Sequence, residues 1–296
     1  MSSTRWACCV NTMPRIASDE NPLTPRVIAN RVWHWLFGQG LVRSLDDFGA
    51  TGDTPSHPEL LDHLALRVVE HDWSLKKLIR EIVLSRTWRQ STQFNPEHFE
   101  IDPENRFLWR ANQRRLEAEA IRDAMLVASG KLIPGKPEHQ PLYDVGEGTV
   151  GQNVFEPVVR QIEMRQRSVY LPRVRNVLPI GLELFDAPDA SNVTGAREMT
   201  TVPLQALYSM NHPFVREQAE GLAERMTQMP ANRQIDYAHL AAFGRLPTGR
   251  ERQMGSYFAR EFRAKERGLS QAELQKKTFA AYCQALMCTA EFAVID

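Results

Sequence analysis

The stretch that decides the fold spans residues 21–65 and has the sequence NPLTPRVIANRVWHWLFGQGLVRSLDDFGATGDTPSHPELLDHLA. Thr24 followed by Pro25 is typical of a helix start, with an N-cap residue before a proline at the first helical position. Apolar residues then recur at helical spacing, at Ile28, Val32, Trp35 and Leu36. Because Gly38 and Gly40 follow directly, the pattern predicts a helix that ends at these glycines and leads into an acidic turn.

A second helix is expected at the end of the same stretch. Ser56 and Glu59 have the spacing of a capping box, in which each side chain bonds the other residue's backbone N–H. The same pattern recurs at Thr248–Glu251 and at Ser270–Glu273. Other helices or helix starts are expected at Ser74, Asp102-Pro103, Leu116–Ser129, Thr201–Pro203 and Ile235–Phe243. These signals predict a mainly α protein, a multi-helix orthogonal bundle with about half or more of its residues helical.

The last expected helix carries an apolar stripe. Its members are Phe279, Tyr282, Cys283 and Leu286, whose spacing puts them on one side of a helix. A free cysteine in such a stripe behaves as a small buried apolar residue. We therefore expect this side of the helix to be buried and Cys283 to be unreactive.

The middle of the chain has a different composition. Residues 131–160 contain four prolines and four glycines and show little periodicity, so we expect a long loop or insertion over 131–166. Residues 168–171 (SVYL) are the best strand candidate, which allows at most a short β-hairpin.

The expected organisation has four parts. They are a disordered tail over residues 1–18, an N-terminal helical part over 19–130, the loop or insertion over 131–166 and a C-terminal helical part over 167–296. We expect the two helical parts to form one domain.

Composition bounds the class of protein. Of the 296 residues, 43% are hydrophobic and 24% are charged, as in ordinary soluble globular proteins. Lys+Arg and Asp+Glu are equal at 36 each, so no net positive field draws in nucleic acid. No apolar run reaches the about 18 residues of a membrane-spanning helix. We therefore expect neither nucleic-acid binding nor a membrane span.

Redox and export signals are absent from the sequence. Without a Cys-x-x-Cys-His motif no haem is attached covalently, and we expect no cofactor in this chain. The apolar patch Trp6–Val10 is too short for the core of a signal peptide. The chain is therefore either cytoplasmic or a piece of a longer exported protein.

Residues 146–151 (GEGTVG) match the Gly-x-Gly-x-x-Gly pattern of dinucleotide-binding turns. That motif needs a strand before it and a helix that opens at it. Pro141 and Pro157 flank the segment and no strand–helix–strand unit surrounds it. We expect an exposed loop that binds no nucleotide.

Three histidines, His57, His63 and His71, lie among acidic residues near the second helix. A metal site needs ligands that converge on one point, and Asp62 and His63 point about 100° apart on a helix. The sequence therefore argues against a metal site. It favours a role for His57 in the start of the helix. His57 stays a candidate ligand residue.

The expected helix 116–129 and the residues before it carry a cluster of charges. Arg115, Glu119 and Arg122 share a face at i,i+3 and i,i+4 spacings, and Asp123 continues the series. The cluster is either a solvated face with salt bridges or a partly buried network that clamps helices or binds a ligand. We predict that Arg115, Glu119 and Arg122 are more buried than surface charges usually are and pair with residues of other helices.

Two further groups could join such a network. On the first helix, Arg26 and Asn30 are also four residues apart. Arg167 belongs to a basic stretch over residues 160–175 that could meet phosphate, sulfate or carboxylate groups. The alternative for that stretch is the solvated flank of a hairpin.

Residues 21–65 resemble the opening of domain of unknown function 1553, which is found in planctomycete multidomain proteins. The resemblance continues in order through HDWSLKKLIREIVLSRTWRQS (71–91), DPENRFLWRANQRRLEAEAIRDAMLVASG (102–130), RSVYLPRVRN (167–176), LFDAPDASNVTGAREMTTVPLQALYSMNHPFV (184–215), AAFGRLPTGRE (241–251) and AYCQALMCTAEFAVID (281–296). Residues 1–18 lie outside it.

The resemblance implies a C-terminal helical domain. In that family the domain usually follows a sister domain of unknown function and an N-terminal c-type cytochrome domain, so the implied partners are such domains of a longer homologue. The longer proteins look exported, which points to the periplasm or cell surface, although this chain has no signal peptide. The family offers no catalytic residue to carry over.

Two hypotheses on function follow. The favoured one is a non-enzymatic module of a larger redox-linked protein, which binds a partner domain or a carbohydrate or anionic ligand. The alternative is an enzyme domain that acts on a carbohydrate or polyanionic substrate through the Arg/Glu/Asp cluster. A cleft lined by Arg26, Arg115, Glu119 and Arg122 would favour the enzyme.

Overall fold

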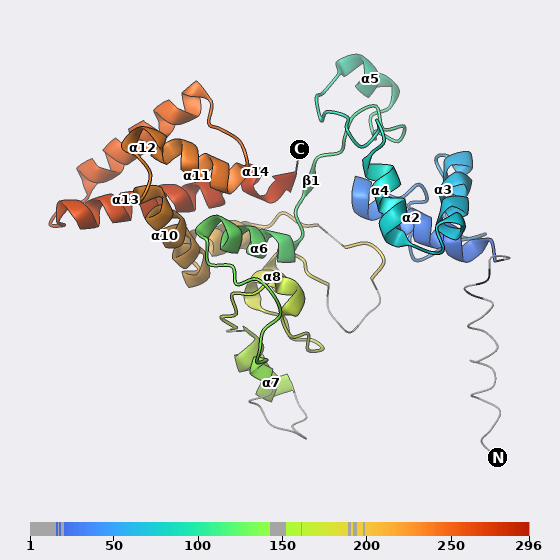
Figure 1. Cartoon of the computed structure of the whole chain (residues 1–296), viewed down its shortest axis with the longest axis horizontal. Coiled ribbons are helices and arrows are strands. Elements are labelled where there is room, and N and C mark those ends of the chain that lie inside the picture. The colour runs from blue at the N-terminus through green and yellow to red at the C-terminus, as the bar shows by residue number, and fades with distance from the viewer. Residues whose placement is uncertain are drawn as a thin grey trace. The chain divides into compact units, whose positions relative to one another are not determined.

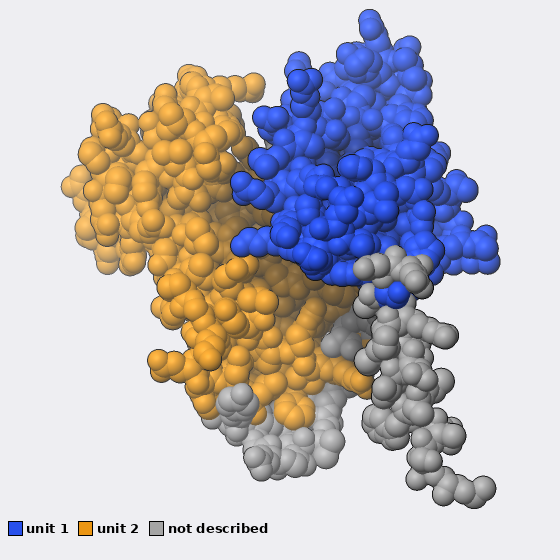
Figure 2. Space-filling view, turned by 45° about the vertical axis from the view of Figure 1, so that its right-hand side comes forward, with its two compact units in different colours: residues 1–114, 296 blue, residues 115–295 orange. Residues whose placement is uncertain are grey.

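The protein is mainly α, as expected, with 57% of its residues in helices (Figure 1). The computed structural model describes residues 16, 18, 21–142, 152–160, 162–188, 191, 194–197 and 199–295. The chain divides into two compact units, which are residues 1–114 with residue 296, and residues 115–295 (Figure 2).

The described part of the first unit has helices packed around one apolar core. They are α2 (Leu23–Phe37), α3 (Pro58–Glu70) and α4 (Leu75–Val83), whereas the short α5 (Pro96–Ile101) buries no residue. Helix α3 is in contact with both α2 and α4. The core side chains include Val32, Trp33, Leu61, Val68, Leu78 and Ile82. The expected order of helix, glycine stop, turn and helix is therefore confirmed for residues 21–65.

The start of α2 differs from the expectation. The helix begins at Leu23, so Thr24 lies inside its first turn and is not the cap. The side-chain oxygen of Asn21 accepts a hydrogen bond from the Leu23 N–H at 3.0 Å. Asn21 reaches the free amides first, and it takes the role expected for Thr24. At the other end, Gly38 has a φ of 82°, a left-handed conformation that suits glycine, and it ends the helix as expected.

The start of α3 also corrects the sequence analysis. Pro58 occupies the first helical position, which makes His57 rather than Ser56 the N-cap residue. No side chain caps this helix, so the capping box expected at Ser56 and Glu59 is wrong. Ser74 is the N-cap residue of α4, but its side chain likewise accepts no hydrogen bond from the helix.

The second unit holds most of the helices. They are α6 (Ala118–Ser129), α7 (Gln152–Arg160), α8 (Ile180–Leu184), α9 (Pro203–Asn211), α10 (Pro213–Thr227), α11 (Gln234–Phe243), α12 (Gly249–Lys265), α13 (Gln271–Met287) and α14 (Ala290–Ala293), with short 3₁₀ turns at Ser168–Tyr170 and Ala231–Arg233. Helix α10 packs against α13, α6 and α11. The capping boxes at the starts of α12 and α13 are both present as expected.

Helix α13 buries the predicted stripe. Phe279, Tyr282, Cys283 and Leu286 are all buried, and they belong to one core with Leu222 and Met226 of α10. Burial in apolar surroundings raises the pKa of the Cys283 thiol to about 12. The stripe predicted from spacing is therefore confirmed.

The strand expected at residues 168–171 is wrong, because Ser168–Tyr170 forms a 3₁₀ turn. The Asp123 carboxylate on α6 accepts hydrogen bonds from both the Ser168 N–H and hydroxyl, which bends this segment onto the helix. In the described ranges, β structure beyond an isolated bridge is limited to β1 (Arg114–Arg115) paired with β2 (Val294–Ile295).

Helix α7 lies within residues 131–166, expected as a loop or insertion, and it contains Pro157. The expected exposed loop at residues 146–151 falls outside the described residues. The division of the chain into parts 1–18, 19–130, 131–166 and 167–296 stays a prediction.

Candidate functional site

The predicted site residues of the first unit have partners within that unit. Arg26 forms an ion pair with Asp62 of α3 at 2.6 Å, and both side chains are substantially exposed. Asn30 is only 1% exposed. Its amide donates to the Val42 carbonyl at 2.9 Å and its side-chain oxygen accepts from the Val42 N–H at 2.9 Å. Asn30 therefore fixes the path of the chain beyond α2.

Two glycines let this loop close on itself. A Cβ at Gly40 would lie 2.4 Å from the Val42 carbonyl oxygen, and a Cβ at Gly52 would lie 1.9 Å from the Asp47 carbonyl oxygen. Such distances are too short for any side chain. The Ser44 hydroxyl adds a clasp, because it donates to the Asp47 carbonyl at 2.7 Å and accepts from the Asp53 N–H at 2.8 Å. Close backbone contacts and the hydrogen bonds of Ser44 therefore fix the course of the loop formed by residues 38–56.

A second loop follows α5 and replaces the helix expected at Asp102-Pro103. The Asp102 carboxylate accepts from the N–H groups of Arg106 and Phe107 at 2.9 and 2.8 Å, so a side-chain turn forms there instead. Asn105 has a left-handed φ of 50° and is buried. Its amide donates to the Arg110 carbonyl at 2.8 Å, which holds the strained turn in place.

The two loops enclose a polar pocket of about 210 Å³ in the first unit. Its lining is Trp33, Gln39, Gly40, Leu41, Arg43, Asp53, Thr54, Ser56, Asn105, Arg106 and Leu108. Within the described part of the chain, the Asp53 carboxylate and the Arg106 guanidinium have no hydrogen-bond or ion-pair partner. Arg43 is paired with Glu104 at 2.5 Å, on the exposed side. Asp53 and Arg106 are both exposed, so the pocket presents solvated charges of both signs that a ligand can reach in exchange for water.

His57 lies beside the pocket but does not line it. Its Nδ1 is 2.9 Å from the hydroxyl of Ser56, which does line the pocket. The His57 ring also meets the ring of Phe107 edge-on at 5.7 Å between centroids, and Phe107 is largely exposed. His57 therefore supports the wall of the pocket and places an exposed aromatic ring near it.

The predicted charge cluster of the second unit holds irregular segments onto α6. Arg115 donates to the Asp186 carboxylate at 2.6 Å and to the side chain of Gln205 on α9 at 3.3 Å. Glu119 accepts from Arg197 at 2.6 Å. Among the hydrogen bonds and ion pairs of the described residues, the expected pairing with another α-helix holds for Gln205, and the Arg122 guanidinium also lies 5.5 Å from the ring centroid of Phe214 on α10. The remaining partners lie in segments between α-helices.

Arg122 is the most enclosed member of this cluster, with a side chain only 12% exposed. It donates to the Gln166 carbonyl at 3.0 Å, to the Ser168 hydroxyl at 3.1 Å and also to the Met164 carbonyl. Burial lowers the pKa of its guanidinium. Asp123 lies 3.5 Å from Arg122, and Arg167, with a 66% exposed side chain, adds a longer contact to Asp123 at 3.6 Å.

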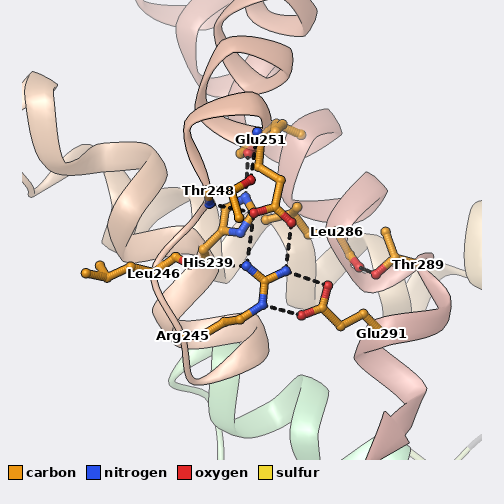
Figure 3. Close-up of polar contacts among 9 residues, drawn as sticks. His239, Arg245, Leu246, Thr248, Glu251, Leu286, Thr289 and Glu291 are labelled. Carbon is orange, nitrogen blue, oxygen red and sulfur yellow. Dashed lines mark hydrogen bonds and ion pairs between the residues drawn. The ribbon is translucent and has the colours of Figure 1, made fainter. Parts of the chain in front are cut away.

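The sequence analysis did not find a third polar cluster, around Arg245 (Figure 3). Arg245 lies between two carboxylates, with hydrogen bonds of 2.7 and 2.9 Å to Glu251 and of 2.6 and 2.8 Å to Glu291. The bonds from Arg245, with those of Thr248, hold the pKa of Glu251 far below its usual value. Every side-chain nitrogen of Arg245 is used, so the cluster is a clamp between α11, α12 and α14. Glu291 lies 40 or more residues after Arg245 and Glu251, and no local sequence pattern predicts that it joins them.

Metal ligands do not gather in the described residues, where no group of three or more His, Cys, Asp or Glu side chains could hold an ion. Among the described helices, none is both long and apolar enough to cross a bilayer.

Comparison with known families places the chain. A family model described as PSD1, protein of unknown function (DUF1553), matches residues 13–259. The chain belongs to this DUF1553 family. The family inferred from residues 21–65 is therefore confirmed, and the match covers the later stretches as far as residues 241–251 but not residues 281–296. Neither a search of curated proteins nor a search of solved structures found a match.

The family match covers the described first unit and most of the second. It begins at residue 13, so it includes the last part of the segment 1–18 that we expected outside the family. It ends within α12, and α13 and α14 follow it. In this DUF1553 protein, both the polar pocket and the α6 cluster lie inside the matched range. Arg106 was missed by the sequence analysis because its place in the pocket depends on a loop some 50 residues earlier in the chain.

Proposed function

We propose that this DUF1553 protein is a ligand-binding helical module, whose first unit binds an acidic carbohydrate in the pocket between the loops 38–56 and 102–110. The observation that carries the proposal is the pair Asp53 and Arg106. Both line one pocket of about 210 Å³, and within the described residues neither side chain has a partner. Polar groups left with unused bonding capacity around a concave site mark a place for a ligand.

The chemistry of the lining favours a sugar that carries a carboxylate or sulfate. The Arg106 guanidinium offers a fork of N–H donors that matches a planar anion. The Asp53 carboxylate accepts hydrogen bonds from hydroxyl groups, and the amide of Gln39 can both donate and accept. Phe107 adds an exposed ring near the polar pocket. A purely apolar molecule would leave these polar groups unsatisfied.

The α6 cluster offers less to a ligand or a substrate. The hydrogen bonds of this cluster stay within the chain. Most of them join Arg115, Arg122 and Asp123 to segments between the α-helices. The alternative is an enzyme that acts through this cluster. The contacts support it less than they support a binding module in the first unit.

Binding of uronic-acid oligosaccharides tests the proposal. We expect saturable binding by calorimetry, with the matched neutral oligosaccharides at least about tenfold weaker, because a charge-assisted contact to Arg106 is worth about 1.5–3 kcal/mol. Arg106→Gln should remove most of the preference for the acidic sugar, and Asp53→Asn should weaken both kinds of sugar. The control is Arg86→Gln, an exposed arginine of the same unit outside the pocket lining. Equal affinity for acidic and neutral sugars, or an Arg86 effect as large as the Arg106 effect, would refute the proposal.

We further propose that the module works as the C-terminal part of a larger exported, redox-linked protein of planctomycete type. A c-type cytochrome domain would carry the haem there, and this chain would carry no cofactor. The support is the family membership together with the resemblance of residues 21–65 to the planctomycete multidomain proteins.

The visible absorption spectrum and the size of the native protein check this context. The isolated 296-residue chain should show no haem band, whereas the native protein should be longer, haem-containing and released from the periplasm or cell surface. A haem band in the isolated chain, or a native protein that is cytoplasmic and haem-free, would contradict it.

A further inference from the structure

The second unit contains a larger cleft, of about 370 Å³, between α11, α12 and α13. Its floor is apolar and includes Met226, Ile235 and Phe279. The volume lies within the range of small-molecule sites, about 300–1,000 Å³. This cleft shares no residue with the pocket of the first unit.

Two arginines of α12 line the cleft, and both are exposed. Arg260 and Arg263 are three residues apart and therefore lie on the same side of the helix. In the described part of the chain, Arg263 has no acidic partner, and its guanidinium stands over the ring of Phe279 at 6.0 Å. The acidic contact of Arg260 is a long one, 3.8 Å to the neighbouring Glu261. Arg263 therefore gives the entrance a positive charge that no acidic side chain of the described chain pairs with, and Arg260 adds a second guanidinium with only this longer contact.

The wall of the cleft is closely packed where it meets α13. Tyr282 lines the cleft, and its hydroxyl lies 3.1 Å from Nε2 of His239, which is only 2% exposed. A Cβ at Gly255 would lie 2.8 Å from the Tyr282 hydroxyl, so the missing side chain lets α12 approach α13. The neighbouring Arg245 clamp holds the turn between α11 and α12 (Figure 3). These contacts hold together the helices that surround the cleft, so the cleft is part of the folded structure.

We infer that this cleft binds a small amphiphilic carboxylate, with its apolar chain on the floor formed by Met226, Ile235 and Phe279 and its carboxylate at Arg260 and Arg263. An apolar floor beneath two exposed guanidinium groups, of which Arg263 has no acidic partner in the described chain, is complementary to a molecule with one apolar and one anionic end. A cationic amphiphile would be repelled at the entrance, and a short hydrophilic anion would leave the floor uncovered.

Three ten-carbon probes that differ only in the head group separate these possibilities. Calorimetry below the micelle concentration should show one saturable site for decanoate, with decanol at least about tenfold weaker. Decyltrimethylammonium should not bind. Absence of saturable decanoate binding, or equal binding of decanoate and decanol, overturns the inference.

Two kinds of variant test the two ends of the site separately. The double variant Arg260→Gln/Arg263→Gln should bring decanoate down to the affinity of decanol and leave decanol unchanged. Ala259→Phe, which fills the cleft from α12, should weaken both probes. The control is Arg250→Gln, an exposed arginine of the same helix outside the cleft. A decanoate affinity that survives Ala259→Phe would place the binding elsewhere and overturn the inference.

Discussion

The second unit should lose stability steeply as the pH rises from about 9 to about 12. Burial raises the pKa of Cys283 from 9.0 to about 12. Below pH 9 both the folded and the unfolded thiol are protonated, and Cys283 contributes no pH dependence. Between the two values the unfolded state loses the proton and the folded state keeps it, which favours unfolding. Three pKa units correspond to about 4 kcal/mol.

Two tyrosines act in the same direction. Burial raises the pKa of Tyr208 and of Tyr282 from 10.0 to about 12, so their contribution is also lost as the pH rises through this window. Denaturant unfolding of the second unit at pH 8, 9, 10 and 11 measures the combined slope. The variant Cys283→Ala should show a clearly shallower slope above pH 9 than the parent protein. Parallel pH profiles for the two proteins would count against a buried thiol.

Replacing Arg122 by Met should destabilise the second unit by about 3–5 kcal/mol, because it removes a buried charge and leaves the groups around it without a donor. The carbonyls of Met164 and Gln166 lose their guanidinium contact, and Asp123 loses a neighbouring positive charge. Denaturant melts at neutral pH give the loss directly.

Arg167→Met is the matched control, because both arginines face Asp123 and belong to the same predicted cluster. With its long 3.6 Å contact and exposed side chain, Arg167 should matter by less than about 1 kcal/mol. Equal losses for the two variants would show that exposure does not separate their roles. A loss below 1 kcal/mol for Arg122→Met would show that the packing of α6 does not depend on the contacts of Arg122 with residues 164–168.

Signals that act within one turn of helix were predicted well. The capping boxes at Thr248 and Ser270 formed because both partners lie three residues apart and need nothing else. The same spacing failed at Ser56, where Pro58 moved the helix start by one position. A local pattern is therefore reliable only while no stronger local constraint competes with it.

Contacts between distant segments set the limit of the sequence analysis. The strand expected at residues 168–171 was lost to Asp123, which lies 45 residues earlier in the chain. For α6, helical spacing placed Glu119 and Arg122 on one face, but Arg115 precedes the helix in β1, and the spacing did not indicate the irregular segments that these residues hold. The pocket of the first unit could not be predicted for the same reason, since Asp53 and Arg106 line one pocket only through the folding of two loops.

The two hydrogen bonds between the Asn30 side chain and the Val42 backbone have a consequence for redesign of the first unit. A side-chain amide stands in for a neighbouring peptide group there, with one donor and one acceptor at the right reach. Among natural side chains only Asn and Gln carry an amide, and Gln is longer by a methylene group. The scaffold and the specificity of the pocket therefore reside in different residues. Asn30, Gly40 and Gly52 set the course of the loop, whereas Gln39 and Thr54 line the pocket; under the proposed function, exchanging these two should change the ligand preference and leave the loop intact.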